Sequence, residues 1–449
     1  MAIKTKLFAH QERGIKLVQH QPHFALFWEP GLGKTLGALA IIDARIDVCD
    51  HHYKTLVVMP NTLIENWQDE IMKFTELRGV ALVGSRKARS VRLQEPADIY
   101  LINYEGLRIM ASELIAKRFD CVVFDESHAL KNHMSQQSKA GYKVAMSVPH
   151  RIVMTGTPIM NTPLDIFGQY LCINPAIFGP SYFRFRAQYA IMGGFLGKQV
   201  QKYVNMETFK RKVLQCADIK TKEECLDLPP KLYEVVRVDM RPEQTKMYKQ
   251  LREQFITAYK DAVVTAPVML TRLMRFSQIT AGFYKTIEGK EISYETNPKH
   301  DWLINWLTET GAKTVVFVRF IHELKALEQA LGKHGISFVS IYGETKDRIG
   351  LVRQFNRETS IQVFIGQIDT AGQGINLQSA SYCVFLSNNY SYGDREQAES
   401  RIHRAGQTAQ NCTYIDVVAR DTIDEKVLKI LKKKESLAGI LTKDLMRIV

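Results

Sequence analysis

The chain has 449 residues, of which 45% are apolar and 24% charged, as is typical of a globular protein of about two to four domains. No apolar run approaches the ~20 residues that cross a bilayer, which argues against an integral membrane protein. The formal net charge of +13 favours a polyanionic partner, nucleic acid before an anionic membrane, although a merely basic globular protein would carry the same charge.

The seven cysteines are scattered and include no C-x-x-C pair, so the sequence indicates neither a zinc site nor a disulfide framework. We expect them to be reduced packing residues. The first residues lack the apolar core of a signal peptide, and we therefore expect a cytosolic protein, or a nuclear one in a eukaryote.

Residues 7–15 have the spacing of an amphipathic helix. Its Gln11 could present an amide to adenine, which needs both a donor and an acceptor. The alternative is an ordinary surface glutamine.

A glycine-rich segment, residues 29–35, separates an apolar run from a helical pattern. Residues 24–28 suit a buried strand, and residues 35–42 have helical spacing. Glycines at a strand-to-helix turn are typical of a P-loop, which binds a nucleotide triphosphate. The longer consensus would have glycine at Trp28, so this is the shorter G-x-G-K-T form. An ordinary tight turn with an exposed lysine is the alternative.

Each residue type in this segment suits a phosphate ligand. Gly31 and Gly33 allow backbone angles that let the amides around Leu32 face phosphate groups at a helix N-terminus. Lys34 supplies a positive charge for the β- and γ-phosphates, and Thr35 a hydroxyl for Mg²⁺. We therefore predict an ATP site here, with Mg²⁺ as cofactor.

Downstream of this segment, apolar strands alternate with helical patterns. Residues 55–60 and 99–104 suit buried strands, and residues 63–71 an amphipathic helix. This alternation predicts a parallel sheet covered by helices, which is an α/β fold.

Residues 121–124 form another apolar run, which ends in two adjacent carboxylates, Asp125 and Glu126. Beside a P-loop, Asp125 would hold Mg²⁺, while Glu126 would orient or deprotonate the attacking water. The alternative is that these acidic residues cap the next helix.

A further apolar strand, residues 151–154, leads into Thr155, Gly156 and Thr157. The threonine hydroxyls could couple the acidic pair to the part of the protein that moves when ATP is hydrolysed. In isolation, the same residues would be only a turn.

Together these motifs resemble the Swi/Snf-type ATPases of helicase superfamily two. The D-E-x-H-x-L-K-N extension at residues 125–132 separates that family from other DExH proteins. The resemblance covers about residues 5–430, and further matching segments are residues 29–35, 155–161, 228–231 and 242–244 with Tyr248. It implies two RecA-like parallel-sheet lobes with helical protrusions between them, and ATP bound between the lobes.

Residues 180–290, between the two predicted lobes, look helical and basic. Phe183 and Arg184 with their neighbours, and the basic residues 210–212, could grip a phosphate backbone or form a solvated helical face packed on a core. By resemblance, this region carries the protrusions, and the polar residues 286–291 suit a hinge.

The second lobe is predicted from apolar strands that alternate with a helix at residues 321–331. The strands are residues 313–318, 337–343, 362–365 and 383–386. They form a second RecA-like sheet without a P-loop of its own.

An arginine pair follows in the family's motif VI, residues 397–407. Arg401 and Arg404 are three apart, so we expect them on one helix face. The γ-phosphate of ATP would relieve the repulsion between the two guanidinium groups; a solvated surface pair is the alternative.

The resemblance also assigns nucleotide contact to Gly374 in motif V and coupling to Gln397. It places DNA contacts on Pro60, Thr62, Tyr104, Lys131, Asn132, Arg319, Gly343 and Asn376. The chain departs from the family pattern at Asp369, at residues 371–372 and at Tyr390. These departures leave the ATPase motifs intact and concern DNA contacts and coupling.

We predict lobe 1 over residues 1–225, with a protrusion at about 180–225, and a linking strand and protrusion over 226–295. Lobe 2 would cover 296–430, and a brace helix or tail 431–449. The predicted function is ATP-driven translocation of a monomer on double-stranded DNA, including forked or branched DNA. A strand-separating DNA or RNA helicase and an ATP-gated nucleic-acid-binding scaffold are the alternatives. No accessory module is recognisable, which favours a bacterial or phage source.

Overall fold

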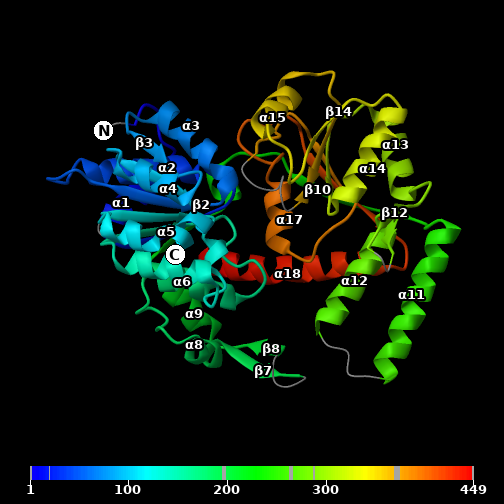
Figure 1. The fold of residues 1–449 in the computed structure, drawn as a ribbon, viewed down its shortest axis with the longest axis horizontal. Helices are drawn as coiled ribbons and strands as arrows, with labels where there is room; N and C mark the ends of the chain where they lie inside the picture. Colours follow the sequence, from blue (N-terminus) through cyan, green and yellow to red (C-terminus); the bar gives the residue numbers. More distant parts are fainter. Residues whose placement is uncertain are drawn as a thin grey trace. The chain divides into compact units, whose positions relative to one another are not determined.

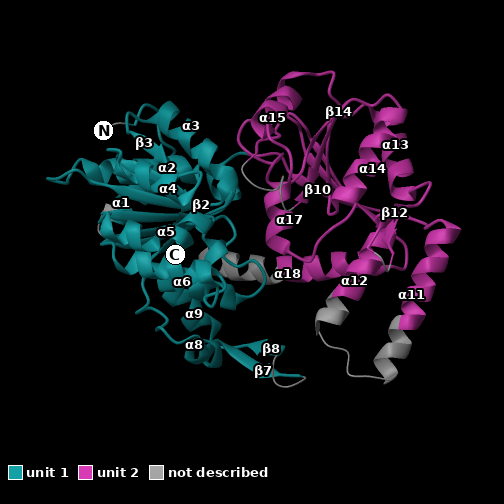
Figure 2. Cartoon of the chain, in the orientation of Figure 1, with its two compact units in different colours: residues 1–227, 436–449 teal, residues 228–435 magenta. Residues whose placement is uncertain are grey.

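The computed structural model describes residues 3–19, 21–194, 199–261, 266–286, 289–368 and 375–446. The chain divides into two compact units, Met1–Asp227 with Ser436–Val449, and Leu228–Glu435 (Figures 1 and 2). Within the described ranges, no helix combines the length and the hydropathy needed to cross a bilayer.

Unit 1 is built on a seven-stranded sheet in the order β3-β4-β2-β5-β6-β1-β9, in which every neighbouring pair is parallel. The strands are β1 (His23–Trp28), β2 (Thr55–Met59), β3 (Gly79–Ala81), β4 (Ile99–Asn103), β5 (Cys121–Asp125), β6 (His150–Met154) and β9 (Ala217–Lys220). Alternate residues of each central strand enter different cores: Ala25 and Phe27 of β1 lie in one, and Leu26 and Trp28 in the other. Strands buried on both faces explain the continuous apolar runs in the sequence. The parallel α/β fold predicted for this lobe is confirmed.

The helices of unit 1 cover both faces of the sheet (Figure 1). They are α1 (Ala9–Gln19), α2 (Lys34–Ile46), α3 (Ile64–Phe74), α4 (Arg86–Gln94), α5 (Tyr104–Ala116), α6 (Gln136–Met146), α7 (Ile166–Ile173), α8 (Tyr182–Tyr189), α9 (Met206–Leu214) and α10 (Lys222–Cys225), with short 3₁₀ turns η1 (Asn61–Leu63), η2 (Ser127–Leu130) and η3 (Pro163–Asp165). Helices α1 to α3 line the core that contains Trp28, and α5 to α7 line the other. Serine or asparagine side chains cap several of these helices, as Ser135 does for α6.

The prediction that residues 180–290 are helical is wrong in part. A hairpin of β7 (Ala190–Gly193) and β8 (Gln199–Tyr203) follows α8, and β9 joins the main sheet beside β1. Phe185 is buried in an aromatic cluster, so it belongs to the core, whereas Phe183 is 71% exposed with the Arg186 guanidinium over its ring. Core packing therefore explains Phe185, whereas phosphate contact at Phe183 and the basic residues beside it stays a prediction.

Unit 2 contains a six-stranded parallel sheet in the order β10-β17-β16-β13-β15-β14. Its strands are β10 (Lys231–Val238), β13 (Thr314–Val318), β14 (Phe338–Ile341), β15 (Val363–Gln367), β16 (Tyr382–Phe385) and β17 (Cys412–Ala419). Four of these strands were predicted for lobe 2, β10 lies in the segment predicted to hold a linking strand, and β17 was not predicted. The second parallel-sheet lobe is thereby confirmed.

Helices also pack on both faces of this second sheet. The helices of unit 2 are α11 (Pro242–Asp261), α12 (Ala266–Thr280), α13 (Pro298–Thr310), α14 (Ile321–Lys333), α15 (Arg348–Arg357), α17 (Tyr392–Glu399) and the start of α18 (Ile423–Met446), whose residues from Ser436 are assigned to unit 1; the unit also has the hairpin β11 (Phe283–Lys285) and β12 (Glu291–Ser293). Phe355 of α15 and Ala398 of α17 pack in one core, and Leu303 of α13 and Leu324 of α14 in the other. Helix α18 begins before residue 431, where the C-terminal helix was predicted to start.

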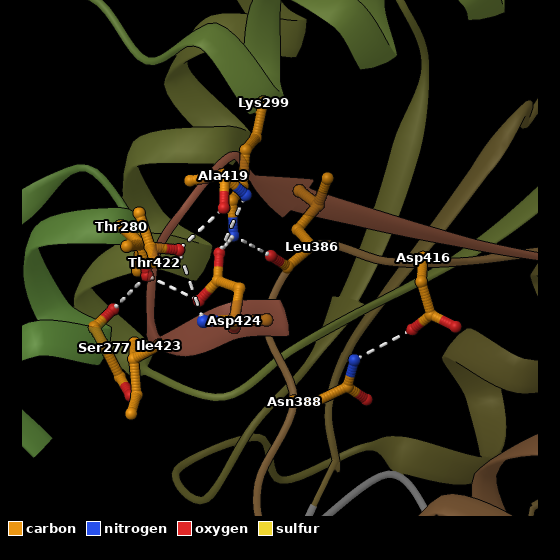
Figure 3. Close-up of polar contacts among 12 residues, drawn as sticks. Ser277, Thr280, Lys299, Leu386, Asn388, Asp416, Ala419, Thr422, Ile423 and Asp424 are labelled. Atoms are coloured by element: carbon orange, nitrogen blue, oxygen red, sulfur yellow. Dashed lines mark hydrogen bonds and ion pairs between the residues drawn. The ribbon is translucent and has the colours of Figure 1, made fainter. Parts of the chain in front are cut away.

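A buried ion pair joins four elements of unit 2 (Figure 3). Lys299, 1% exposed on α13, donates from Nζ to Asp424 Oδ2 at 2.6 Å and to the Leu386 carbonyl at 2.7 Å. The Asp424 carboxylate, at the start of α18, also accepts from Thr280 Oγ1 at 2.7 Å and from the Ala419 amide at 3.1 Å. Every charge in the cluster is therefore hydrogen-bonded, as a buried ion pair requires.

Replacing Lys299 by methionine is expected to destabilise this part of unit 2 by ~3–5 kcal/mol, because Asp424 would stay buried without its cation. Hydrogen exchange of the α13 and β16 amides in the full chain measures the effect locally. Adding Asp424→Leu should restore much of the protection, since both charges are then removed. Lys285→Met, at a partly exposed 3.9 Å pair with Glu291, is the control and should change protection little. Equal protection in Lys299→Met and the control would contradict the prediction.

Candidate nucleotide-binding and catalytic site

The glycine-rich segment forms the turn between β1 and α2 in unit 1. Gly31 has φ 97° and Gly33 φ 69°, in the left-handed region that favours glycine. A Cβ on Gly33 would also lie 2.6 Å from Gln11 Nε2, so no side chain fits there. The first turn of α2, which begins at Lys34, directs backbone amides and the positive end of its dipole toward this loop. This is the strand-turn-helix geometry predicted for a triphosphate site.

The P-loop lysine and threonine both lie on the first turn of α2. Lys34 Nζ donates to the Trp28 carbonyl at 3.0 Å, which holds the ammonium group beside the loop. Thr35 is half-buried next to it. Both side chains are placed where a phosphate and its metal ion would be held, and their roles stay predictions.

Trp28, which stands where the longer consensus has glycine, is a packing residue. Its ring is fully buried, and a Cβ on Gly14 of α1 or Gly37 of α2 would lie 2.9 Å or 2.6 Å from it. Its Nε1 donates to Asp218 Oδ2 of β9 at 2.6 Å. The ring therefore fills a space that two glycines leave open under the P-loop. The only signal in the sequence was the tryptophan at a consensus glycine.

Gln11 contacts the P-loop from α1 and is fully buried, so the surface-glutamine alternative is wrong. Its Nε2 donates to the Gly33 carbonyl at 3.0 Å, and its Oε1 accepts from the Phe8 amide at 2.9 Å. The neighbouring His10 Nε2 lies 2.8 Å from the Leu32 carbonyl. Gln11 thus supports the loop, and its contact with adenine stays a prediction.

The acidic pair lies at the carboxyl end of β5. Asp125 accepts from Trp67 Nε1 at 2.9 Å through Oδ2 and from the Glu126 amide at 2.8 Å through Oδ1. Burial, and then the nearby Glu126 carboxylate, raise the pKa of Asp125. Glu126 has φ 48°, a left-handed conformation that is unfavourable for a residue with a Cβ. Such backbone strain is concentrated at functional sites.

Thr155, in the loop after β6, contacts the acidic pair, and the coupling role expected of it stays a prediction. Its Oγ1 donates to Glu126 Oε2 at 3.2 Å and accepts from the Thr157 amide at 3.1 Å. Gly156, between them, lies so close to Pro30 that a Cβ would be 2.4 Å from the proline Cδ. The P-loop, the acidic pair and the loop after β6 are therefore in direct contact within unit 1.

Three further residues of this site were not singled out from the sequence. His128 Nδ1 lies 3.1 Å from Thr155 Oγ1 and 3.3 Å from Glu126 Oε2. Gln169 of α7 accepts from Ser127 Oγ at 2.8 Å and donates to the Pro158 carbonyl at 2.7 Å. The sequence did contain a signal for the histidine, because it is the last residue of the D-E-x-H motif. Trp67 and Gln169 had none, because each looked like part of an ordinary amphipathic helix.

The predicted DNA contact at Tyr104 is corrected by the structure. Tyr104 is 5% exposed, and its hydroxyl donates to the Asp125 carbonyl at 2.8 Å. Burial raises the pKa of this phenol well above its usual range. The residue begins α5 behind the acidic pair and orients that pair, and it has no surface for DNA. The other candidates in unit 1 are half-buried or exposed, and their role stays a prediction: Pro60, Thr62, Lys131 and Asn132.

The arginine pair of unit 2 is brought together by a turn and not by a helix. Helix α17 ends at Glu399, so the predicted helix face is wrong. Arg401 Nη1 and Arg404 Nη1 donate to the same Ile375 carbonyl, at 3.1 Å and 3.3 Å. Arg401 Nε also donates to the carbonyl of Gln397, whose side chain is buried. Both guanidinium groups are thereby fixed against one short stretch of backbone.

The remaining predictions for unit 2 lie on half-buried or exposed positions. Arg319 donates its backbone amide to Ser387 Oγ at 2.8 Å, and Asn376 Nδ2 donates to Gln378 Oε1 at 3.1 Å. Gly343 is exposed. Gly374, Asp369 and residues 371–372 lie outside the described residues.

Tyr390, at the family's tryptophan position, is half-buried against a small apolar cluster of unit 2. Tyr248 and Phe276 belong to the same cluster, with ring centroids 4.8 Å apart. The tyrosine therefore acts as a packing residue at this position.

Comparison with known proteins identifies two domain families. The SNF2-related domain matches residues 10–284, and the helicase conserved C-terminal domain matches residues 298–406. A Mycoplasma pneumoniae protein described as an uncharacterized ATP-dependent helicase is 24% identical over 97% of this chain and 42% of its own length. The human DNA annealing helicase and endonuclease ZRANB3 is 25% identical over 97% of this chain and 40% of its own. The chain thus spans about two fifths of these relatives.

A solved structure gives a weaker likeness. The SWI2/SNF2 ATPase core of Sulfolobus solfataricus in complex with double-stranded DNA matches 98% of this chain and 94% of its own, with 24% identity and a TM-score of 0.47. The family assignment comes from the domain matches, since the SNF2-related domain alone takes up residues 10–284, more than half of the 449. The chain belongs to the SNF2-related family of helicase-like ATPases.

Proposed function

We propose that this chain is a DNA-stimulated ATPase that moves along double-stranded DNA without separating its strands. The observation that carries the proposal is the contact network of unit 1, in which Thr155 bonds Glu126 beside a P-loop that Gly156 touches. A protein that only binds ATP needs the loop; it does not need a carboxylate held for water activation and connected to a second loop.

Phosphate binding is assigned to the turn before α2. Gly31, Gly33 and the first amides of α2 would surround the β- and γ-phosphates, with Lys34 adding a positive charge. Thr35 and Asp125 would hold Mg²⁺, because a hydroxyl and a carboxylate are the hard oxygen donors that this ion prefers. Bound Mg²⁺ would neutralise phosphate charge. Trp67 and the Glu126 amide keep the Asp125 carboxylate oriented for this task.

Water activation is assigned to Glu126. Its carboxylate is held by Thr155 and lies 3.3 Å from His128 Nδ1. It would accept a proton from the attacking water as that water approaches the γ-phosphorus. Thr155, Thr157 and Gln397 would couple this event to movement, and Arg401 and Arg404 would stabilise the charge that develops on the γ-phosphate.

We propose DNA as the polymer along which the chain moves, because the chain is basic and because the names of two relatives refer to DNA. The formal net charge is +13. ZRANB3 is named a DNA annealing helicase, and a Drosophila ananassae relative, 25% identical over 92% of this chain, a DNA repair and recombination protein. We propose a monomer that acts in remodelling, repair, recombination or replication, on duplexes that include forked or branched DNA. We place it in the cytoplasm of a bacterium or a phage-infected host cell, or in the nucleus of a eukaryote.

Duplex DNA is expected to stimulate hydrolysis more than single-stranded DNA or RNA. If ~6 to 10 phosphates are neutralised, affinity should fall by ~10³ to 10⁵ between 50 and 200 mM salt. Steady-state ATPase rates with each nucleic acid, and binding across that salt range, measure both effects. Displacement of the third strand of a triplex reports movement, and release of a labelled strand from a partial duplex reports strand separation.

The outcomes separate the proposal from its alternatives. Triplex displacement that needs ATP, without strand release, supports translocation. Strand release, or stimulation by RNA alone, would instead indicate a helicase. The same ATPase rate with and without every nucleic acid would favour an ATP-gated scaffold.

A further inference from the structure

Three metal-ligating side chains meet in the loop between α2 and β2. His51 Nδ1 lies 3.2 Å from Cys49 Sγ and 3.2 Å from Asp50 Oδ1. One donor atom from each residue lies within 4.8 Å of the others, the one such trio among the described residues. Cys49 is half-buried, and Asp50 and His51 are exposed. The donors are thus both close together and accessible from solvent.

A fourth residue, from another part of the sheet, orients the histidine. His51 Nε2 donates to Asp120 Oδ1 at 2.9 Å, and the other carboxylate oxygen of Asp120 accepts from the Lys54 amide at 2.8 Å. Asp120 is 18% exposed, unlike Asp50, which is fully exposed. With its proton on Nε2, the neutral imidazole keeps Nδ1 as the ligating nitrogen. A carboxylate that accepts from the far ring nitrogen is the usual outer partner of a metal-bound histidine.

The types of donor atom in this trio, and the distances between them, indicate which cations the trio would bind. Thiolate and imidazole bind borderline and soft divalent ions, and discriminate against Mg²⁺ and Ca²⁺. In a tetrahedral zinc site, bond lengths of about 2.3 Å to sulfur and 2.0 Å to nitrogen or oxygen place sulfur ~3.5 Å, and oxygen ~3.3 Å, from the nitrogen. His51 Nδ1 is 3.2 Å from each of the two donor atoms, which is close to these values. Because Cys49 Sγ also lies 3.6 Å from His51 Nε2, the cysteine side chain has to turn toward the Nδ1 lone pair when an ion binds.

We propose that Cys49, Asp50 and His51 form a binding site for a zinc-class divalent cation, with Asp120 as the residue that orients His51. Solvent would supply the fourth ligand. A bound ion would tie the loop after α2, through His51 and Asp120, to the segment that precedes β5.

This site is separate from the proposed Mg²⁺ site. The loop precedes β2, which begins at Thr55, and Asp120 precedes β5, which begins at Cys121. The P-loop and Asp125 lie at the carboxyl ends of β1 and β5. Because the sheet is parallel, the two sites lie at opposite ends of its strands: the proposed cation site at the amino ends and the Mg²⁺ site at the carboxyl ends. The inference therefore does not rest on the proposed function.

The test is metal binding by the chelator-treated full chain without nucleotide. Zn²⁺ is titrated in competition with a chromophoric chelator, and Co²⁺ is titrated while the thiolate-to-cobalt absorption band is recorded. We expect one tight equivalent and a cobalt band in the wild type. Cys49→Ser should remove the band. Asp120→Asn should weaken Zn²⁺ binding by ~10- to 100-fold, because it changes the partner that orients His51 and leaves the three ligands in place.

Matched variants keep this test specific. Cys225→Ser removes another half-buried thiol of unit 1, and His52→Gln removes the adjacent imidazole, which bonds the Ala97 carbonyl. Both should bind Zn²⁺ like the wild type. Thermal unfolding without metal should be alike in the wild type, Cys49→Ser, Cys225→Ser and His52→Gln, because these side chains are not in the core. The same measurement shows how much stability Asp120→Asn loses, since its carboxylate also accepts from the Lys54 amide. A wild type without a stoichiometric equivalent, or Cys49→Ser with unchanged binding and an unchanged cobalt band, would overturn the proposal.

Discussion

The Glu126→Gln variant is expected to bind ATP about as tightly as the wild type and to hydrolyse it at a near-zero rate, a loss of at least ~10² to 10⁴. The amide has the shape of the carboxylate and can still accept from Thr155 Oγ1, which now bonds Glu126 Oε2 at 3.2 Å. It cannot take a proton from water. Binding of a fluorescent ATP analogue and steady-state phosphate release measure the two properties separately.

Lys34→Ala is expected to fail at an earlier step. Removing the ammonium group beside the P-loop should weaken nucleotide binding itself, and hydrolysis should be lost with it. The matched control for both variants is Glu105→Gln, an exposed carboxylate on α5, which should behave like the wild type. Wild-type turnover in Glu126→Gln would remove Glu126 from the mechanism. Loss of ATP binding in Glu126→Gln would instead make it a binding residue.

Arg401→Ala and Arg404→Ala are each expected to lower DNA-stimulated turnover by ~10³ to 10⁵, the range measured for arginine fingers. ATP affinity should change little, because phosphate binding is assigned to the loop before α2. The physical reason is that the guanidinium charge acts on charge that develops during hydrolysis. Turnover at saturating ATP and DNA, compared with analogue binding, is the measurement.

Both arginines also have a structural contact, so a control for folding is needed. Each donates to the Ile375 carbonyl, and Arg→Lys variants keep a cation there while losing the planar group. Arg237→Ala, at an exposed pair with Glu425 in the same unit, should leave turnover unchanged. Normal hydrolysis in both alanine variants would reject the assignment. A defect in only one would mean that the pair was misassigned and that a single arginine acts.

Much of unit 1 could be predicted from the sequence because its signals are local. A continuous apolar run followed by glycines, lysine and a helical pattern specifies β1, the P-loop and α2 within 24 consecutive residues, His23–Ile46. The acidic pair follows its own strand directly, and the carboxyl ends of parallel strands meet at one edge of a sheet. Thr155 could be expected near Glu126 for the same reason, since it follows the neighbouring strand β6.

Predictions failed where a short pattern suited two environments. An aromatic residue after a strand is equally suited to DNA and to the core, and Tyr104 is in the core because its hydroxyl meets the Asp125 carbonyl. A spacing of three fits a helix and also a pair of turns, and Arg401 and Arg404 lie in turns because α17 ends at Glu399. The strand β9 was hidden in a segment that looked helical. It forms because the open edge of β1 supplies backbone partners.

The sequence by itself determined the strands of the two parallel-sheet lobes and the glycine-rich turn after β1. These depend on apolar periodicity and on the backbone freedom of glycine, which act over a few neighbouring residues. The resemblance to a family singled out the arginine pair, whose role stays a prediction. Only the tertiary structure decided which distant side chains serve them. Trp28 finds its hydrogen-bond acceptor in Asp218, 190 residues away, and His51 finds Asp120 69 residues away. Such contacts depend on which strand ends and loops the fold brings together, and a single sequence carries no local signal for that.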